Sequence, residues 1–108
     1  MYPEDKRPVI LNNPTSIRAT VGEVVRLSIE THNADNATVA WRKEGENQYI
    51  RENDRYQFQQ SAGFVYLQIN GCRISDSGIY HCHLIGETDS SSAGISLYIV
   101  GMSDEISR

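Results

Sequence analysis

The sequence has 108 residues, of which 39% are hydrophobic and 22% are charged, and its formal net charge is −4. This length suits one compact domain with a single core, and the ordinary composition argues against a disordered or fibrous chain. The acidic balance argues against a nucleic-acid partner. No apolar run approaches the roughly 18 residues that cross a bilayer, so we expect no membrane partner either.

Short runs of alternating apolar and polar residues recur along the chain, about ten residues apart, with turn residues between them. This period-2 pattern predicts an all-β sandwich or barrel rather than helices. We expect strands near residues 8–12, 15–21, 23–31, 37–43, 47–50, 55–60, 63–70, 78–86 and 92–100. The flanking residues 1–7 and 101–108 are polar and unpatterned, which predicts a linker before the domain and a linker or tail after it.

The same alternation predicts which side chains face the core, because successive side chains on a strand point to opposite faces. Two antiparallel sheets packed through their inner faces would bury one core. The side chains that we expect in it are Val25, Leu27, Ile29, Val39, Trp41, Phe58, Val65, Leu67, Ile69, Tyr80, Cys82, Leu84, Ile95, Leu97 and Ile99.

The spacing of three core residues is informative. Trp41 follows Ile29 by 12 residues, Cys82 follows Trp41 by 41, and Tyr80 lies two residues before Cys82. An immunoglobulin fold places a cysteine, a buried tryptophan and a second cysteine at such intervals, with a tyrosine corner before the second cysteine.

The chain therefore resembles the immunoglobulin family, and specifically its I-set type, over residues 8–100. The matching segments are GEVVRLSI (22–29), VAWRK (39–43), DRYQF (54–58), VYLQIN (65–70), DSGIYHC (76–82) and ISLYI (95–99). The resemblance implies a Greek-key sandwich of two antiparallel sheets, with Ile29, Trp41, Leu67, Tyr80 and Cys82 at the centre of its core.

One position departs from the family pattern. Ile29 stands where the family usually has its first cysteine, so the inter-sheet bridge cannot form. A bridge across so long a loop would be worth roughly 2–4 kcal/mol, and an oxidising compartment would favour keeping it. Its loss therefore points to a reducing compartment.

I-set domains without this bridge resemble those of giant intracellular muscle proteins such as titin, twitchin, obscurin and myomesin. The resemblance implies a cytoplasmic, sarcomeric or cytoskeletal module that acts as a mechanical spacer and docks other proteins. The partners would be neighbouring immunoglobulin or fibronectin-type domains, or cytoskeletal proteins. Two alternatives remain: an extracellular adhesion or receptor module that has lost its bridge, and a regulatory domain that flanks a kinase in a twitchin-like chain.

Arg55 and Asp76 correspond to the ion pair that such domains bury at the base of the sandwich, with the Tyr80 hydroxyl closing the same corner. The family resemblance gives this pair a structural role. The first and last strands, near 15–20 and 93–99, are expected to pair in parallel. Pulling on the chain ends would then shear them apart.

Phe64 and Tyr66 alternate with the core residues of their strand and should face outward, where exposed aromatic side chains favour contact with a partner protein. We expect no catalysis, because no phosphate-binding glycine loop and no carboxylate pair occurs in the sequence. No cofactor and no small-molecule substrate are expected for the same reason.

The remaining polar and sulfur groups have ordinary explanations. His81 and His83 share one face of a strand, but two imidazoles do not make a metal site. Cys72 and Cys82 are expected to be buried free thiols. A bridge between them is the alternative, which an expected Cα separation of roughly 10 Å opposes, because disulfides need less than ~7 Å. Asn36-Ala37-Thr38 is a glycosylation sequon whose use would require an extracellular location.

Overall fold

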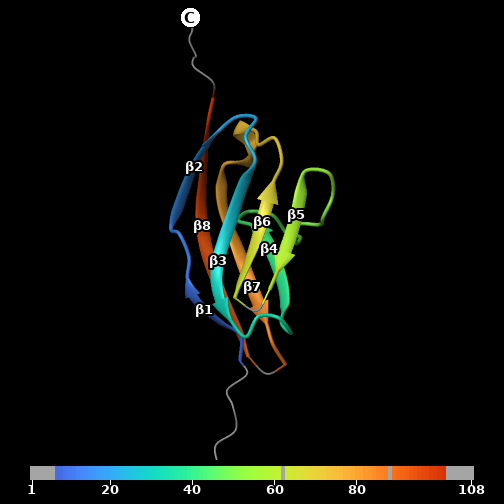
Figure 1. Cartoon of the computed structure of the whole chain (residues 1–108). Helices are drawn as coiled ribbons and strands as arrows, with labels where there is room; N and C mark the ends of the chain where they lie inside the picture. Colours follow the sequence, from blue (N-terminus) through green and yellow to red (C-terminus); the bar gives the residue numbers. More distant parts are fainter. Residues whose placement is uncertain (1–6, 62, 88, 102–108) are drawn as a thin grey trace, which may run out of the picture.

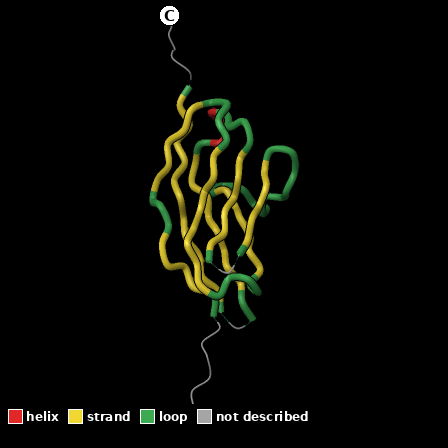
Figure 2. Tube along the Cα trace, in the orientation of Figure 1, coloured by secondary structure: helices red, strands yellow, loops and turns green. Residues whose placement is uncertain are grey.

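The computed structural model describes residues 7–61, 63–87 and 89–101, which form two packed layers of strands (Figures 1 and 2). The elements are β1 (Val9–Asn12), β2 (Ser16–Thr20), β3 (Val25–His32), β4 (Thr38–Lys43), β5 (Tyr56–Gln60), β6 (Phe64–Ile69), a 3-10 turn η1 (Ile74–Asp76), β7 (Gly78–Ile85) and β8 (Ser90–Val100). The predicted linkers at 1–7 and 101–108 lie outside the described residues, apart from positions 7 and 101.

Each layer is a four-stranded sheet. The first has the order β1-β3-β6-β5 and the second the order β2-β8-β7-β4. All neighbouring strands are antiparallel except β2 and β8, which are parallel. The chain crosses between the sheets at every connection except those from β5 to β6 and from β7 to β8. The all-β sandwich is confirmed.

The strands form where the alternating pattern lies. In β3 the burial alternates without a break, so that Val25, Leu27, Ile29 and Thr31 are buried and the residues between them are exposed. The inner faces of β6, β7 and β8 follow the same rule. Residues of one face of each sheet thus pack against the other sheet, as expected for a sandwich.

Trp41 lies at the centre of this core. It is 1% exposed and pairs across the sheet with Cys82, which is fully buried. Ile29, Leu67 and Tyr80 are fully buried in the same cluster. Val39 and Phe58, also predicted to be in the core, are only partly buried and pack against it from β4 and β5.

The segment 47–50 was expected to form a strand, and this prediction is wrong. It is a bend and loop between β4 and β5. The Ile50 N–H joins it to β4 by donating to the carbonyl oxygen of Trp41 at 2.8 Å. The segment Asn-Gln-Tyr-Ile has only two apolar residues, side by side, so the alternation there was too short to predict a strand.

The chain leaves the first sheet and joins the second between β1 and β2. Pro14 sits in this gap and lacks the N–H that a continuous strand would need there. The pairing of β1 with β3 shifts register between Ile10 and Asn12, and such an irregularity locally bends a strand, here just before the crossing. No helix among the described residues is long and apolar enough to cross a membrane.

Candidate functional site

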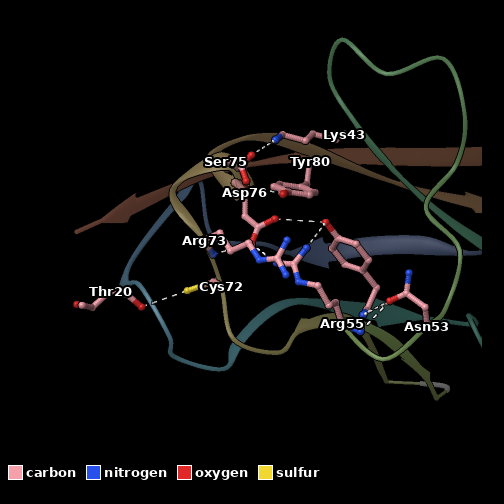
Figure 3. A network of polar contacts seen from close by, with 10 residues as sticks. Thr20, Lys43, Asn53, Arg55, Cys72, Arg73, Ser75, Asp76 and Tyr80 are labelled. Atoms are coloured by element: carbon pink, nitrogen blue, oxygen red, sulfur yellow. Dashed lines mark hydrogen bonds and ion pairs between the residues drawn. The ribbon is translucent and has the colours of Figure 1, made fainter. Parts of the chain in front are cut away.

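A polar corner lies at the end of the sandwich where η1 leads into β7 (Figure 3), and it is formed by Arg55, Tyr56, Arg73, Asp76 and Tyr80. The Asp76 side chain is 5% exposed and that of Arg55 is 26% exposed, so the carboxylate is buried and the guanidinium partly covers it. Arg55 Nη2 donates to Asp76 Oδ2 in a direct ion pair. The two side chains that the resemblance pairs are therefore in contact.

Three further groups satisfy Asp76. The main-chain N–H of Arg73 donates to Asp76 Oδ2 at 2.7 Å, and the Tyr56 hydroxyl donates to Asp76 Oδ1 at 3.3 Å. The Tyr80 hydroxyl donates to the main-chain carbonyl of Asp76 at 2.6 Å, which is the bond of a tyrosine corner. The corner thus joins β5, η1 and β7 through one buried carboxylate residue.

The electrostatics of the corner keep its donors protonated. Burial alone would lower the pKa of Arg55, but the hydrogen bond to Asp76 and its negative charge outweigh burial and raise it. Burial, followed by the charge of Asp76, raises the pKa of Tyr56. Burial is also the main cause that raises the pKa of Tyr80. These shifts keep the Arg55 guanidinium charged and the hydroxyls of Tyr56 and Tyr80 protonated, so all three remain hydrogen-bond donors at neutral pH.

Two contributors to this end of the sandwich were missed at the level of sequence. Tyr56 was read only as part of the DRYQF segment, although its hydroxyl bridges the ion pair. Lys43 Nζ donates to the main-chain carbonyl of Ser75 at 2.6 Å and lies 5.8 Å from the ring centre of Tyr80. In the sequence, these roles could be inferred only from position: Tyr56 directly follows Arg55, and Lys43 is the last residue of β4.

Phe64 and Tyr66 do face outward, on the first sheet. Their rings stack with centroids 6.4 Å apart, and Phe64 is 48% exposed. Arg26 lies over the Tyr66 ring at 5.3 Å and donates to Gln68 Oε1 at 2.7 Å, so the guanidinium covers part of Tyr66.

An open groove of about 480 Å³ adjoins Phe64 at the edge where β1 leaves the first sheet. The residues that line it are Asn12, Asn13, Pro14, Ser28, Ile29, Glu30, Gly63 and Phe64. Phe64 is therefore an exposed aromatic side chain beside an open groove lined by both polar and apolar residues, a setting suited to contact with another protein.

The two histidines lie together on the outer face of the second sheet. His81 Nε2 is 2.9 Å from Glu44 Oε1, whereas His83 Nε2 is buried without a hydrogen-bond partner. Tyr49 packs edge-on against His83, with centroids 5.9 Å apart. Within the described ranges, no group of three or more His, Cys, Asp or Glu side chains is placed to hold a metal ion.

Both cysteines are free and buried. Cys72 donates its thiol to the main-chain carbonyl of Thr20 at 3.1 Å, close to the polar corner (Figure 3). Burial raises the pKa of Cys82 to about 12, so this thiol is protonated and unreactive in the fold.

Two packed sheets, a tryptophan opposite a core cysteine and a tyrosine corner define an immunoglobulin-like sandwich. The chain belongs to the immunoglobulin I-set domain family, whose family model matches residues 8–99.

The chain is similar to modules of muscle proteins. It is 23% identical over 94 residues to smooth muscle myosin light chain kinase of Gallus gallus, which covers 87% of this chain and 5% of the kinase. The chain thus spans about 5% of the length of this curated relative.

Solved structures of titin domains share the fold. Titin domain M7 has a TM-score of 0.80 at 24% identity, covering 92% of this chain and 99% of that domain. A chain in the structure of the complex of titin M10 with an obscurin-like 1 immunoglobulin domain has a TM-score of 0.78 at 20% identity, covering 87% of this chain and 94% of that chain. The chain is therefore an I-set module similar in fold to immunoglobulin domains of titin.

Proposed function

We propose that this chain is a structural and protein-binding module of a multi-domain cytoskeletal protein of the sarcomere, without catalytic activity of its own. It acts in the cytoplasm as a mechanical spacer between neighbouring domains and as a docking site for them. Residues 1–7 and 101–108 serve as the connections to those neighbours. Similarity to titin domains and two buried free thiols support this proposal.

The observation that carries the proposal is the parallel pairing of β2 with β8. Five Cα pairs join them, from Ser16 with Ser96 to Thr20 with Val100. The described chain enters beside β1 at one end of the sandwich and leaves after β8 at the other (Figure 1). A load on the two ends therefore shears all the hydrogen bonds of this pair together, which resists extension more than unzipping them singly.

The pairing offers a matched test with proline. The Thr15 carbonyl accepts from the Ser96 N–H, and the Val21 N–H donates to the Val100 carbonyl. Since the backbone groups of alternate residues on a strand point to opposite sides, every second residue of β2 faces β8. The Ala19 N–H therefore points toward β8, and the Arg18 N–H points away from it. Ala19→Pro should lower the force at which single molecules unfold, since it removes a donor of the sheared pair. Arg18→Pro should lower it much less, because proline is tolerated at the open side of an edge strand. Equal forces for both variants and the parent would contradict the mechanical role.

The docking role is assigned to Phe64 and Tyr66. Phe64 projects beside the groove, and its burial by a neighbouring immunoglobulin or fibronectin-type domain would remove apolar surface from water. Phe64→Ser should weaken binding to the adjacent domains of the parent protein, measured by calorimetry. Tyr98→Ser, at an aromatic side chain that is 58% exposed on the second sheet, is the control. Equal affinities of the two variants would remove Phe64 from the docking surface.

Similarity to myosin light chain kinase favours one second candidate, a regulatory domain beside a kinase. This candidate would be supported if the flanking sequence held a kinase domain whose activity falls when this immunoglobulin domain is added. The extracellular alternative makes a separate prediction, because Asn36 is exposed in the turn before β4. A glycan on Asn36, found by mass spectrometry of protein from its natural source, would overturn the cytoplasmic location.

A further inference from the structure

The turn after β6 contains an asparagine followed directly by a glycine, Asn70-Gly71. Of the chain's seven asparagines, only Asn70 is followed by glycine. The main-chain nitrogen of the next residue can attack an asparagine side chain, and glycine offers no side chain to hinder the approach. Gly71 is exposed, with φ +60.

The fold holds the Asn70 side chain by both ends of its amide. Nδ2 donates to the main-chain carbonyl of Asp54 at 3.0 Å, and Oδ1 accepts from Gln68 Nε2 at 2.9 Å. The main-chain N–H of Asn70 also donates to the carbonyl of Arg55 at 2.8 Å. Asn70 therefore fastens the end of β6 to the turn that carries Arg55 into the polar corner.

We propose that Asn70–Gly71 is a modification site that is closed in the folded domain and reacts when this turn opens. In the reaction the Gly71 nitrogen gives up its proton and bonds to Cγ of Asn70. The bond from Cγ to Nδ2 breaks, and ammonia leaves with the added proton. Water then opens the cyclic imide at one of its two carbonyls, which leaves aspartate or isoaspartate at position 70.

The folded state opposes this step because ring closure removes Nδ2 from the Asp54 carbonyl and turns the side chain away from Gln68. Both hydrogen bonds must first break, and local opening of this kind has a free-energy cost that the unfolded chain does not have. The state of the turn thus controls the rate of modification.

The products do not fit the corner. Aspartate puts an acceptor where Nδ2 donated to the Asp54 carbonyl. Isoaspartate adds a methylene to the main chain just before Cys72, whose N–H donates to the Glu23 carbonyl and whose carbonyl accepts from the Gly22 N–H, both at 2.9 Å. A lengthened chain misaligns these two bonds. A domain that has opened and reacted therefore refolds with a weakened corner, and it stays modified because the loss of ammonia is not reversed.

The test compares folded protein with protein in urea at the same neutral pH and temperature, followed by peptide mass spectrometry of every asparagine. We expect Asn70 to react at least about tenfold faster in urea than in the fold, and faster than the other six asparagines in urea. Equal rates with and without urea would overturn the gating. A faster reaction at another asparagine in urea would overturn the assignment of the site.

Two variants separate this local gate from general instability. Gln68→Ala removes the partner of Asn70 Oδ1 and should speed the reaction in folded protein several-fold. Gln59→Ala, an exposed glutamine on the neighbouring strand β5, should leave the rate unchanged. Equal rates for the two variants would show that the hydrogen bond to Asn70 does not hold the site closed. Asn70→Gln should abolish the modification at this position. Wild-type protein that is incubated in urea until Asn70 has reacted and is then refolded should melt at a lower temperature than fresh protein, and an unchanged melting temperature would contradict the weakened corner.

Discussion

Asp76 accepts hydrogen bonds from four other residues, which lie at or just before the start of β5, just before η1 and on β7. Its carboxylate accepts from Arg55, from the main chain of Arg73 and from Tyr56, and its carbonyl accepts from Tyr80. An unpaired buried charge is costly, and sharing the carboxylate among several donors reduces the cost of losing any one of them. The role of Asp76 is therefore structural, because it holds the end of the sandwich together.

Removing either partner of the ion pair should therefore have unequal effects. Asp76→Ala should lower the free energy of unfolding by about 3–5 kcal/mol, because it leaves the buried face of Arg55 and the Arg73 N–H without a partner. Arg55→Ala should cost less, since the guanidinium is partly exposed and Asp76 keeps two other donors. Urea denaturation of both variants measures the difference. A larger loss for Arg55→Ala would mean that the arginine, not the carboxylate, holds the corner.

His83 should make stability depend on pH. Burial lowers its pKa below 6.5, and the positive charges of Arg42 and His81 lower it further. A base whose pKa is lower in the fold binds its proton more readily when unfolded, so stability is full above pH 6.5 and is lost as the pH falls through the folded pKa. Protonation would place an unpaired cation beneath Tyr49, with Glu44 already engaged by His81.

Thermal unfolding between pH 7 and about pH 5 checks this dependence. The melting temperature of His83→Gln should fall less over this range than that of the wild type. His32→Gln, at an exposed histidine on β3, should behave like the wild type. Identical pH profiles for His83→Gln and the wild type would show that the histidine titrates alike in both states.

At the scale of strands, alternation alone was enough to place the inner faces of β3, β6, β7 and β8. It succeeds because a strand with one buried face must repeat every two residues. It failed at 47–50, where two adjacent apolar residues carry no period. It also could not show that Tyr56 reaches Asp76 or that His83 is covered by Tyr49, because these contacts depend on how far separate strands and loops lie from one another.

The first residue of β7, Gly78 in the DSG segment, lies at a position where the backbone and a neighbouring side chain favour glycine. Gly78 has φ +150, and a Cβ built there would lie 2.8 Å from Lys43 Cε, whose ammonium donates to Ser75. Gly78→Ala should cost about 1–3 kcal/mol through backbone strain and displacement of Lys43. Gly63→Ala, where a Cβ meets nothing within 4 Å, should change stability by less than about 0.5 kcal/mol. Equal shifts in the urea midpoints would mean that Gly78 is not required at this turn.

At the scale of the whole molecule, Ile29 stands where the resemblance to bridged immunoglobulin domains places their first cysteine. Ile29 on β3 and Cys82 on β7 belong to different sheets, and both are fully buried in one core. If Ile29 fills the place of a missing sulfur, then Ile29→Cys should restore an inter-sheet bridge. The rest of the fold, including Trp41 beside Cys82, is already in place for it.

The variant should be less stable than the wild type when reduced and more stable when oxidised. The smaller side chain leaves a cavity worth about 1–2 kcal/mol, whereas a bridge between residues this far apart in sequence constrains the unfolded chain by about 4 kcal/mol. Urea denaturation with and without reductant measures both terms. With Cys82→Ala added, oxidation should no longer stabilise the variant. A bridge that forms to Cys72 instead would mean that Cys72, and not Cys82, faces position 29 across the core, and the alignment of this chain with the bridged immunoglobulin domains would then be wrong at its centre.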